Sequence, residues 1–193
     1  NMNKGILLAV ALLLLTVGSL SCSDNKNPKY KNRAFEFFLH YNPAWEVREG
    51  VGSAIVVFLA PKTDKLDFFR ENMTITIQDL TRPISLDEYT RSVEEMIKAI
   101  GQQTPDTTSN ILESAPIRVS GKVGHKIIYT MTQYGNPPEF VKAGIAPRVD
   151  SAGETVQMML AWVIRENRVY LFTYAAQKNS FDIFIKDIDA MIQ

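Results

Sequence analysis

Sulfur and imidazole ligands are scarce in this 193-residue chain, which has one cysteine, Cys22, and two histidines, His40 and His125. A single cysteine excludes an intrachain disulfide and a zinc site built from several thiolates. No other histidine or cysteine lies near His40 or His125 at a metal-ligand spacing, so we expect two ordinary strand residues. A catalytic base or a metal site would require the fold to bring the two histidines together.

An excess of charge of one sign is also missing. The chain has 21 basic and 21 acidic residues, and 20 basic residues remain when Lys4 is removed with the N-terminal segment described below. Lys and Arg are dispersed among Asp and Glu, whereas phosphate binding leaves a basic patch or stripe. The balance therefore argues against nucleic acid as a partner. It argues equally against electrostatic attachment to anionic lipid.

Motifs of catalysis and ion binding are absent from the sequence too. It has no nucleophile elbow and no calcium-loop spacing, and a turn between strands explains Gly121–Gly124 better than a phosphate loop does. Carboxylates that a weak calcium or zinc site could use occur at Asp64, Asp67, Asp79, Asp182, Asp187 and Asp189. We expect these side chains to be solvated, no metal or cofactor to be bound, and the chain not to be an enzyme.

The N-terminus carries the clearest signal. A short basic segment, Met2-Asn3-Lys4, precedes the uncharged run 5–20 and then Ser21-Cys22, which is the secretory pattern. The run is shorter than the ~20 apolar residues that a membrane-spanning helix needs. The segment resembles a bacterial lipoprotein signal, in which a small residue precedes the modified cysteine. We expect residues 2–21 to be a signal peptide and Cys22 to carry a lipid that anchors the chain to a bacterial membrane, facing the periplasm or the exterior. The alternatives are an uncleaved anchor helix, or a plain secretory signal with Cys22 as a free thiol.

The mature chain is expected to form one domain behind a tether. Residues 22–33 comprise the lipidated cysteine and a polar stretch that cannot bury apolar surface, and a single domain follows over residues 34–193. Alternating or continuous apolar runs predict strands around residues 35–41, 45–47, 54–59, 73–78, 111–119, 125–133, 156–164 and 169–176.

Two helices are predicted beside these strands. Ser85 and Glu88 form a capping box at the start of a helix over residues 86–100, which Gly101 should end. Ser180 can cap a C-terminal helix with a strong apolar stripe. Short turns join the last four strands in pairs, so hairpins and an antiparallel sheet follow, and the two apolar helix stripes must cover that sheet. The fold class is therefore α+β.

At this point the chain resembles the PsbP-like proteins. The matching features are Phe35–Tyr41 with Asn42-Pro-Ala-Trp45, the helix start Ser85–Tyr89, Ile111–Ser114 with Gly121 before a strand, and Val169–Tyr174 followed by a Phe-rich helix. The resemblance covers nearly all of residues 34–193. It implies an antiparallel sheet flanked by helices on both faces, an α/β/α sandwich that DcrB-like periplasmic lipoproteins also use. Members of this group mostly bind proteins or aid assembly, although a shared fold does not transfer a function.

Loop aromatics are the candidate contacts for such a partner. Phe68 and Phe69 lie in a charged connection, and Tyr134 and Phe140 lie in or beside the stretch 135–154, which is rich in Gly and Pro. Exposed aromatics on loops often anchor partners, although these could instead fold back over the sheet. We expect a non-catalytic lipoprotein that binds or helps assemble a protein partner at the cell envelope. The alternative is a small ligand or metal ion held between the helices and the sheet.

Overall fold

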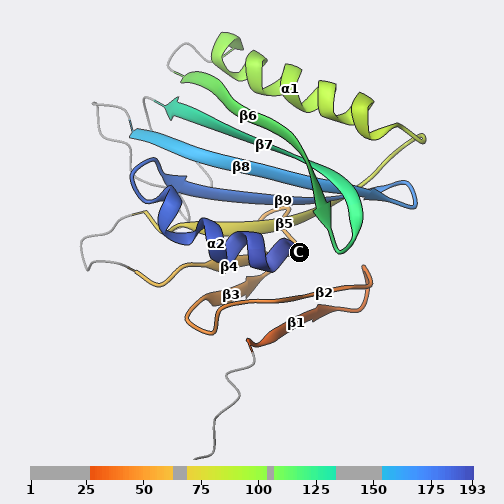
Figure 1. Cartoon of the computed structure of the whole chain (residues 1–193), viewed down its shortest axis with the longest axis vertical. Coiled ribbons are helices and arrows are strands. Elements are labelled where there is room, and N and C mark those ends of the chain that lie inside the picture. The colour runs from red at the N-terminus through yellow and green to blue at the C-terminus, as the bar shows by residue number, and fades with distance from the viewer. Residues whose placement is uncertain (1–26, 63–68, 104–106, 134–153) are drawn as a thin grey trace, which may run out of the picture.

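A seven-stranded antiparallel sheet is the centre of the protein in the computed structural model, which describes residues 27–62, 69–103, 107–133 and 154–193 (Figure 1). Its strands lie in the order β3 (Glu46–Glu49), β4 (Val56–Leu59), β5 (Asn72–Asp79), β9 (Arg168–Gln177), β8 (Glu154–Arg165), β7 (Lys122–Gln133) and β6 (Thr107–Val119). Every neighbouring pair is antiparallel. The continuous apolar run that predicted a strand inside the sheet is β4, whose four residues are all buried.

Two tight turns create the predicted hairpins. Ser120 and Gly121 have φ of 48° and 76°, and Glu166 and Asn167 have φ of 49° and 64°. Two successive residues with positive φ form the turn whose twist matches that of the flanking strands. Both hairpins are confirmed. The first connection is shorter than the predicted five residues, because β7 already begins at Lys122.

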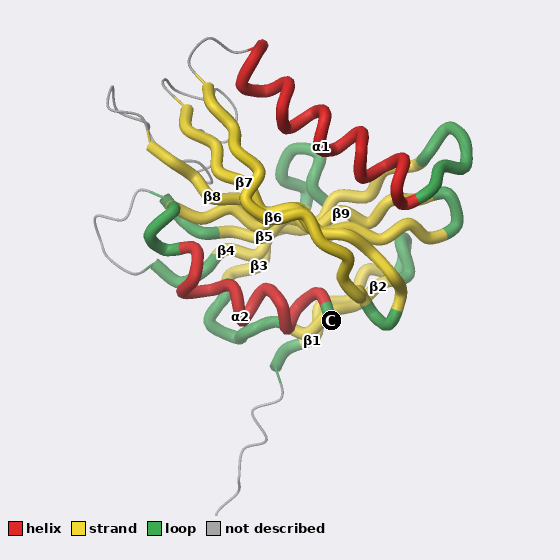
Figure 2. The backbone as a smooth tube through the Cα atoms, turned by 45° about the horizontal axis from the view of Figure 1, so that its top comes forward, coloured by secondary structure: helices red, strands yellow, loops and turns green. Residues whose placement is uncertain are grey.

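Strand β8 is buried on both of its faces. Met159, Ala161 and Val163 belong to one apolar cluster together with residues of α2 (Phe181–Ile192). Leu160 and Trp162 belong to a second cluster together with residues of α1 (Leu86–Gln103). Since successive side chains of a strand point to opposite faces, the two clusters divide the core, and Figure 2 shows strands of the main sheet between the two helices.

The capping box of α1 forms only in part. The Ser85 hydroxyl accepts a hydrogen bond from the backbone N–H of Glu88 at 3.1 Å, as predicted. The Glu88 carboxylate instead pairs with Arg82. The prediction that Gly101 ends the helix is wrong, because the helix continues to Gln103.

Helix α2 packs through the stripe expected of it, with Phe181, Phe184, Ile188, Met191 and Ile192 buried. The prediction of a side-chain cap is wrong, because Ser180 stands at the N-cap position without a capping hydrogen bond. Other polar contacts hold the helix. The Asp187 carboxylate accepts a hydrogen bond from the indole N–H of Trp45 at 3.1 Å, and the Tyr174 hydroxyl donates to the carbonyl oxygen of Phe181 at 3.0 Å.

Part of the predicted tether forms a separate two-stranded sheet, which corrects that prediction. Strand β1 (Lys29–Asn32) pairs with β2 (Phe37–His40), so residues 29–33, which we expected to be tether, belong to the folded domain. Tyr30 is the physical reason. Its ring packs on Phe58 at a centroid distance of 5.8 Å, and its hydroxyl donates to Glu49 at 2.7 Å, so this polar segment does bury apolar surface.

The observed architecture confirms the α+β class and the antiparallel sheet. The described residues contain no helix that is both long and apolar enough to cross a membrane. The predicted signal peptide and Cys22 lie outside the described residues.

Candidate functional site

The two histidines are not brought together. His40 lies in the two-stranded sheet, where its Nδ1 is 3.1 Å from the carbonyl oxygen of Asn27. His125 lies in β7 of the main sheet and stacks on Trp162, with ring centroids 5.4 Å apart. A site that requires both imidazoles is therefore not formed.

His125 belongs instead to a chain of hydrogen bonds with Ser114 and Glu94. The Ser114 hydroxyl lies 2.8 Å from a Glu94 carboxylate oxygen and 2.8 Å from His125 Nε2. A carboxylate only accepts, so the single hydroxyl proton goes to Glu94, and Nε2 must donate to Ser114. Burial lowers the pKa of His125, whereas the charges of Glu94 and Asp87 raise it. In a nucleophilic triad the imidazole takes the serine proton and the carboxylate orients the imidazole. Here the serine lies between the carboxylate and the imidazole, and its proton goes to Glu94. His125 therefore does not take the Ser114 proton, and Ser114 is not activated as a nucleophile.

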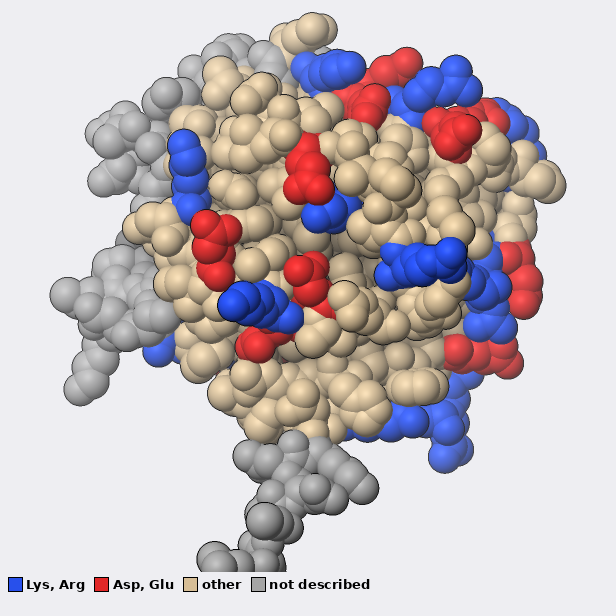
Figure 3. Space-filling view, in the orientation of Figure 1, with Lys and Arg blue, Asp and Glu red and all other residues tan. Residues whose placement is uncertain are grey.

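Two of the carboxylates considered for a metal site make structural contacts. Asp79 pairs with Arg168 at 2.6 Å, and Asp187 binds Trp45 as described above. Asp64 and Asp67 lie outside the described residues, and within the described part of the chain no three His, Cys, Asp or Glu side chains could jointly hold a metal ion. Acidic and basic side chains are interspersed over the face seen in Figure 3.

Of the four aromatic residues predicted to bind a partner, only Phe69 lies within the described residues. Phe69 is only 3% exposed, so the expectation of an exposed anchor does not hold there, and this ring folds back into the protein. Phe68, Tyr134 and Phe140 lie outside the described residues.

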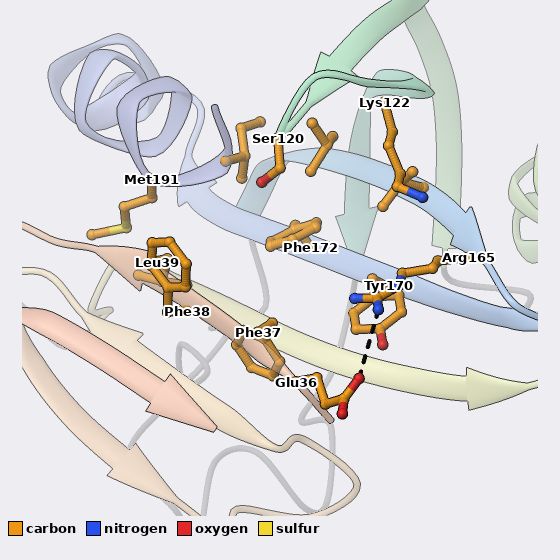
Figure 4. Close-up of a pocket in the computed structure, with 13 residues that line it drawn as sticks. Glu36, Phe37, Phe38, Leu39, Ser120, Lys122, Arg165, Tyr170, Phe172 and Met191 are labelled. Atoms are coloured by element: carbon orange, nitrogen blue, oxygen red, sulfur yellow. Dashed lines mark ion pairs between the residues drawn. The ribbon is translucent and has the colours of Figure 1, made fainter. Parts of the chain in front are cut away.

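A mostly apolar pocket that the sequence did not indicate opens beside α2 (Figure 4). Its volume is about 260 Å³. We call it the Tyr170 pocket. It is lined by Glu36, Phe37, Phe38, Leu39, Val119, Ser120, Lys122, Val163, Arg165, Tyr170, Phe172, Met191 and Ile192.

Four parts of the fold meet to form the Tyr170 pocket: β2, the β6–β7 turn, the β8–β9 hairpin and the C-terminal end of α2. The turn is tied to the helix end, because the backbone N–H of Ser120 donates to the carbonyl oxygen of Gln193 at 3.2 Å. On the opposite side, the Tyr170 hydroxyl donates to the carbonyl oxygen of Phe35 at 3.0 Å. Phe37 meets the Tyr170 ring edge-on at 6.4 Å. These contacts hold the walls of the pocket in place.

The rim of the pocket carries charge, while its floor does not. Arg165 pairs with Glu36 at 3.6 Å across the opening. Lys122 is exposed on the turn side, and it has no ion-pair partner among the residues that the structure describes. By contrast Leu39, Phe172, Met191 and Ile192 are each less than 9% exposed. An apolar floor below polar groups is the general form of a binding pocket, and it offers no activated nucleophile or base.

No local pattern in the sequence could have revealed this pocket. The alternation of β2 and the stripe of α2 identify Leu39, Met191 and Ile192 as core residues, but not that their packing leaves a space. The backbone of Glu36, at the edge of the pocket, has a φ of 53°, which only the structure reveals. A positive φ in a residue other than glycine is uncommon.

Comparisons with known proteins agree on the fold. No family model matches this chain, and no curated protein matches its sequence. Among solved structures, cyanobacterial PsbP (CyanoP) from Synechocystis is similar, with a TM-score of 0.57, 14% identity, and coverage of 91% of this chain and 95% of that chain. LpqN, involved in cell envelope biogenesis of Mycobacterium tuberculosis, has a TM-score of 0.51, 9% identity, and coverage of 89% and 84%. The chain therefore has the PsbP-like fold that the resemblance implied.

Proposed function

We propose that this chain of PsbP-like fold is a non-catalytic binding protein of the bacterial cell envelope, anchored by a lipid on Cys22. Its scaffold would be a sheet with α1 on one face and α2 on the other, which the two core clusters support. LpqN, a structural neighbour, is involved in cell envelope biogenesis. The export pattern at residues 2–22 supports the same location.

The Tyr170 pocket is the observation that carries the binding proposal. Its volume of about 260 Å³ lies below the roughly 300–1,000 Å³ of pockets that enclose a small-molecule ligand. It suits a single apolar side chain, and burial of one Leu or Phe contributes about 1.5–3 kcal/mol. We therefore propose that the pocket receives an apolar side chain of a protein partner.

A blocking substitution at the rim tests this proposal. Lys122→Trp adds bulk at the opening, and because Lys122 is exposed the fold should be kept. Lys98→Trp, at an exposed position of α1, is the matched control. Proteins cross-linked to the lipidated chain in native membranes would be captured and identified by mass spectrometry. Loss of the anchor contact should lower capture of the partner by roughly tenfold or more.

The outcomes separate the alternatives. A specific protein captured by the wild type and by Lys98→Trp, but not by Lys122→Trp, supports the proposal. Equal capture by all three, with unchanged circular dichroism, contradicts it. An apolar molecule found in the pocket by native mass spectrometry would favour the small-ligand alternative. The intact mass of the membrane-extracted protein tests the lipid on Cys22 separately. Phe68, Tyr134 and Phe140 stay proposed partner contacts, and alanine variants in the same capture test them.

A further inference from the structure

The outward side of the two-stranded sheet gathers cations around an exposed aromatic ring. In the β1–β2 register Lys29 lies opposite His40, and Lys31 lies opposite Phe38. All four residues are exposed, while the alternate pair, Tyr30 and Leu39, is buried. We call Lys29, Lys31, Phe38 and His40 the hairpin face.

The charge of this hairpin is one-sided, although the whole chain is neutral. Residues 29–40 contain three cations, Lys29, Lys31 and Arg33, and one acid, Glu36. Glu36 pairs with Arg165, whereas none of the three cations has an ion-pair partner among the described residues. In Figure 3 blue side chains gather at the lower right edge, where the two-stranded sheet lies in Figure 1. The even composition thus conceals a local basic surface.

An aromatic ring is part of this basic surface. Phe38 is 57% exposed, and Lys29 Nζ lies 3.6 Å from the centre of its ring. A cation beside an apolar ring suits the boundary between lipid headgroups and acyl chains, where the charge meets phosphates and the ring meets hydrocarbon.

The chain leaves the domain beside this face. The carbonyl oxygen of Asn27 contacts His40, and that of Pro28 accepts a hydrogen bond from the backbone N–H of Tyr41 at 3.0 Å. Cys22 precedes Asn27 by five residues, and five residues span at most about 18 Å. This step rests on the lipid anchor proposed above. With a lipid on Cys22, Asn27 at the start of the described domain stays within about 18 Å of the membrane surface.

We propose that the hairpin face docks on an anionic lipid surface and orients the domain on its membrane. Phe38 also lines the Tyr170 pocket, so docking would hold that pocket close to the membrane surface. The contact is secondary to the lipid, because each Lys or Arg near an anionic surface strengthens binding by only roughly fivefold. Its role is orientation.

Vesicle binding without the lipid tests the proposal. The chain from residue 22 carries Cys22→Ser, so that any membrane affinity comes from the protein surface. The described core clusters include no residue before Tyr30, so this chain retains them. It is sedimented with vesicles of phosphatidylcholine, with and without phosphatidylglycerol, at low and high salt.

Charge reversal on the hairpin face is compared with charge reversal elsewhere. The variant is Lys29→Glu with Lys31→Glu, which leaves the Tyr170 pocket untouched. The control is Lys98→Glu with Lys186→Glu, which makes the same change in net charge at exposed positions on the two helices.

We expect salt-sensitive binding to the anionic vesicles only, weakened roughly 25-fold or more by the hairpin variant. The control pair should stay within about twofold of the wild type, because charges distant from the surface are screened. Equal binding to both vesicle types, or equal loss in the two variants, would overturn the proposal. So would an unchanged vesicle affinity in the hairpin variant together with loss of the captured protein, since the face would then be a protein contact. Absence of lipid on Cys22 would refute the anchor and leave the vesicle result intact.

Discussion

Replacement of Gly124 by alanine should destabilise the protein through a backbone collision. Gly124 lies in β7, and a Cβ atom built there would collide with the carbonyl oxygen of Trp162 and lie 3.3 Å from its carbonyl carbon. Separations below 3.0 Å do not occur for real Cβ atoms, so β7 and β8 would have to move apart. The obstacle is a main-chain group, so no side-chain rotation can relieve it.

Two effects of opposite sign compete in this substitution. Gly124 does not have a positive φ, so alanine is permitted and would stabilise by about 0.4–1 kcal/mol through the unfolded chain. Overpacking of a well-packed interior costs about 1–3 kcal/mol, occasionally more. Since the collision is with backbone between two paired central strands, we expect the free energy of unfolding to fall by about 2 kcal/mol. The corresponding decrease in Tm is about 4–8 °C for a domain of this size.

Urea unfolding followed by circular dichroism measures the change, with an unaltered m-value as the sign that stability alone has changed. Gly121→Ala is the comparison. Its Cβ would meet no atom within 4 Å, but its φ is 76°, so it should cost about 1 kcal/mol through backbone strain alone. If Gly124→Ala were as stable as the wild type or more stable, the close approach of β7 and β8 would be refuted.

Three further predictions concern single contacts. Asp187→Ala removes the acceptor of the indole N–H of Trp45, which is hydrogen-bonded at 3.1 Å. The free energy of unfolding, measured by urea unfolding, should fall by about 1–3 kcal/mol. No loss of stability would show that water replaces the carboxylate. Ser85→Ala removes the capping hydrogen bond of α1 and should lower the free energy of unfolding by about 1 kcal/mol. Ser180→Ala removes no capping hydrogen bond and should leave the free energy of unfolding unchanged. Equal effects of the two substitutions would contradict this difference between the helix starts. Burial lowers the folded-state pKa of His125 below 6.5, so the stability it contributes is present above pH 6.5 and lost as pH falls through the folded pKa. Tm measured against pH should therefore decline less steeply on acidification in His125→Gln, and identical profiles would exclude this linkage.

Short-range patterns predicted the elements well, for an identifiable reason. The hairpin from β8 to β9 follows from alternating side chains around Glu166 and Asn167, and α1 follows from apolar residues at spacings of three and four after Ser85. Each of these signals lies within one segment of chain. The predicted helix end at Gly101 failed because glycine permits a stop without enforcing one.

Segments whose role depends on a distant partner were not predictable. The stretch 29–32 looks like a tether in the sequence, yet Tyr30 anchors it against Phe58 and Glu49. Phe69 looks like an exposed loop aromatic, yet it is buried. For Tyr30 the deciding contacts join residues that local periodicity does not relate, and the burial of Phe69 likewise appears only in the folded chain.

The sequence by itself determined the export pattern, the α+β class, the hairpins and the apolar stripes of the two helices, because these depend on local composition and periodicity. Only the tertiary structure decided where cavities and surfaces lie. The Tyr170 pocket exists because β2, the β6–β7 turn, the β8–β9 hairpin and the end of α2 meet around a space that their side chains leave unfilled. The hairpin face exists because strand pairing brings Lys29 and Lys31 beside Phe38 and His40, which concentrates charge that the even composition of the chain conceals.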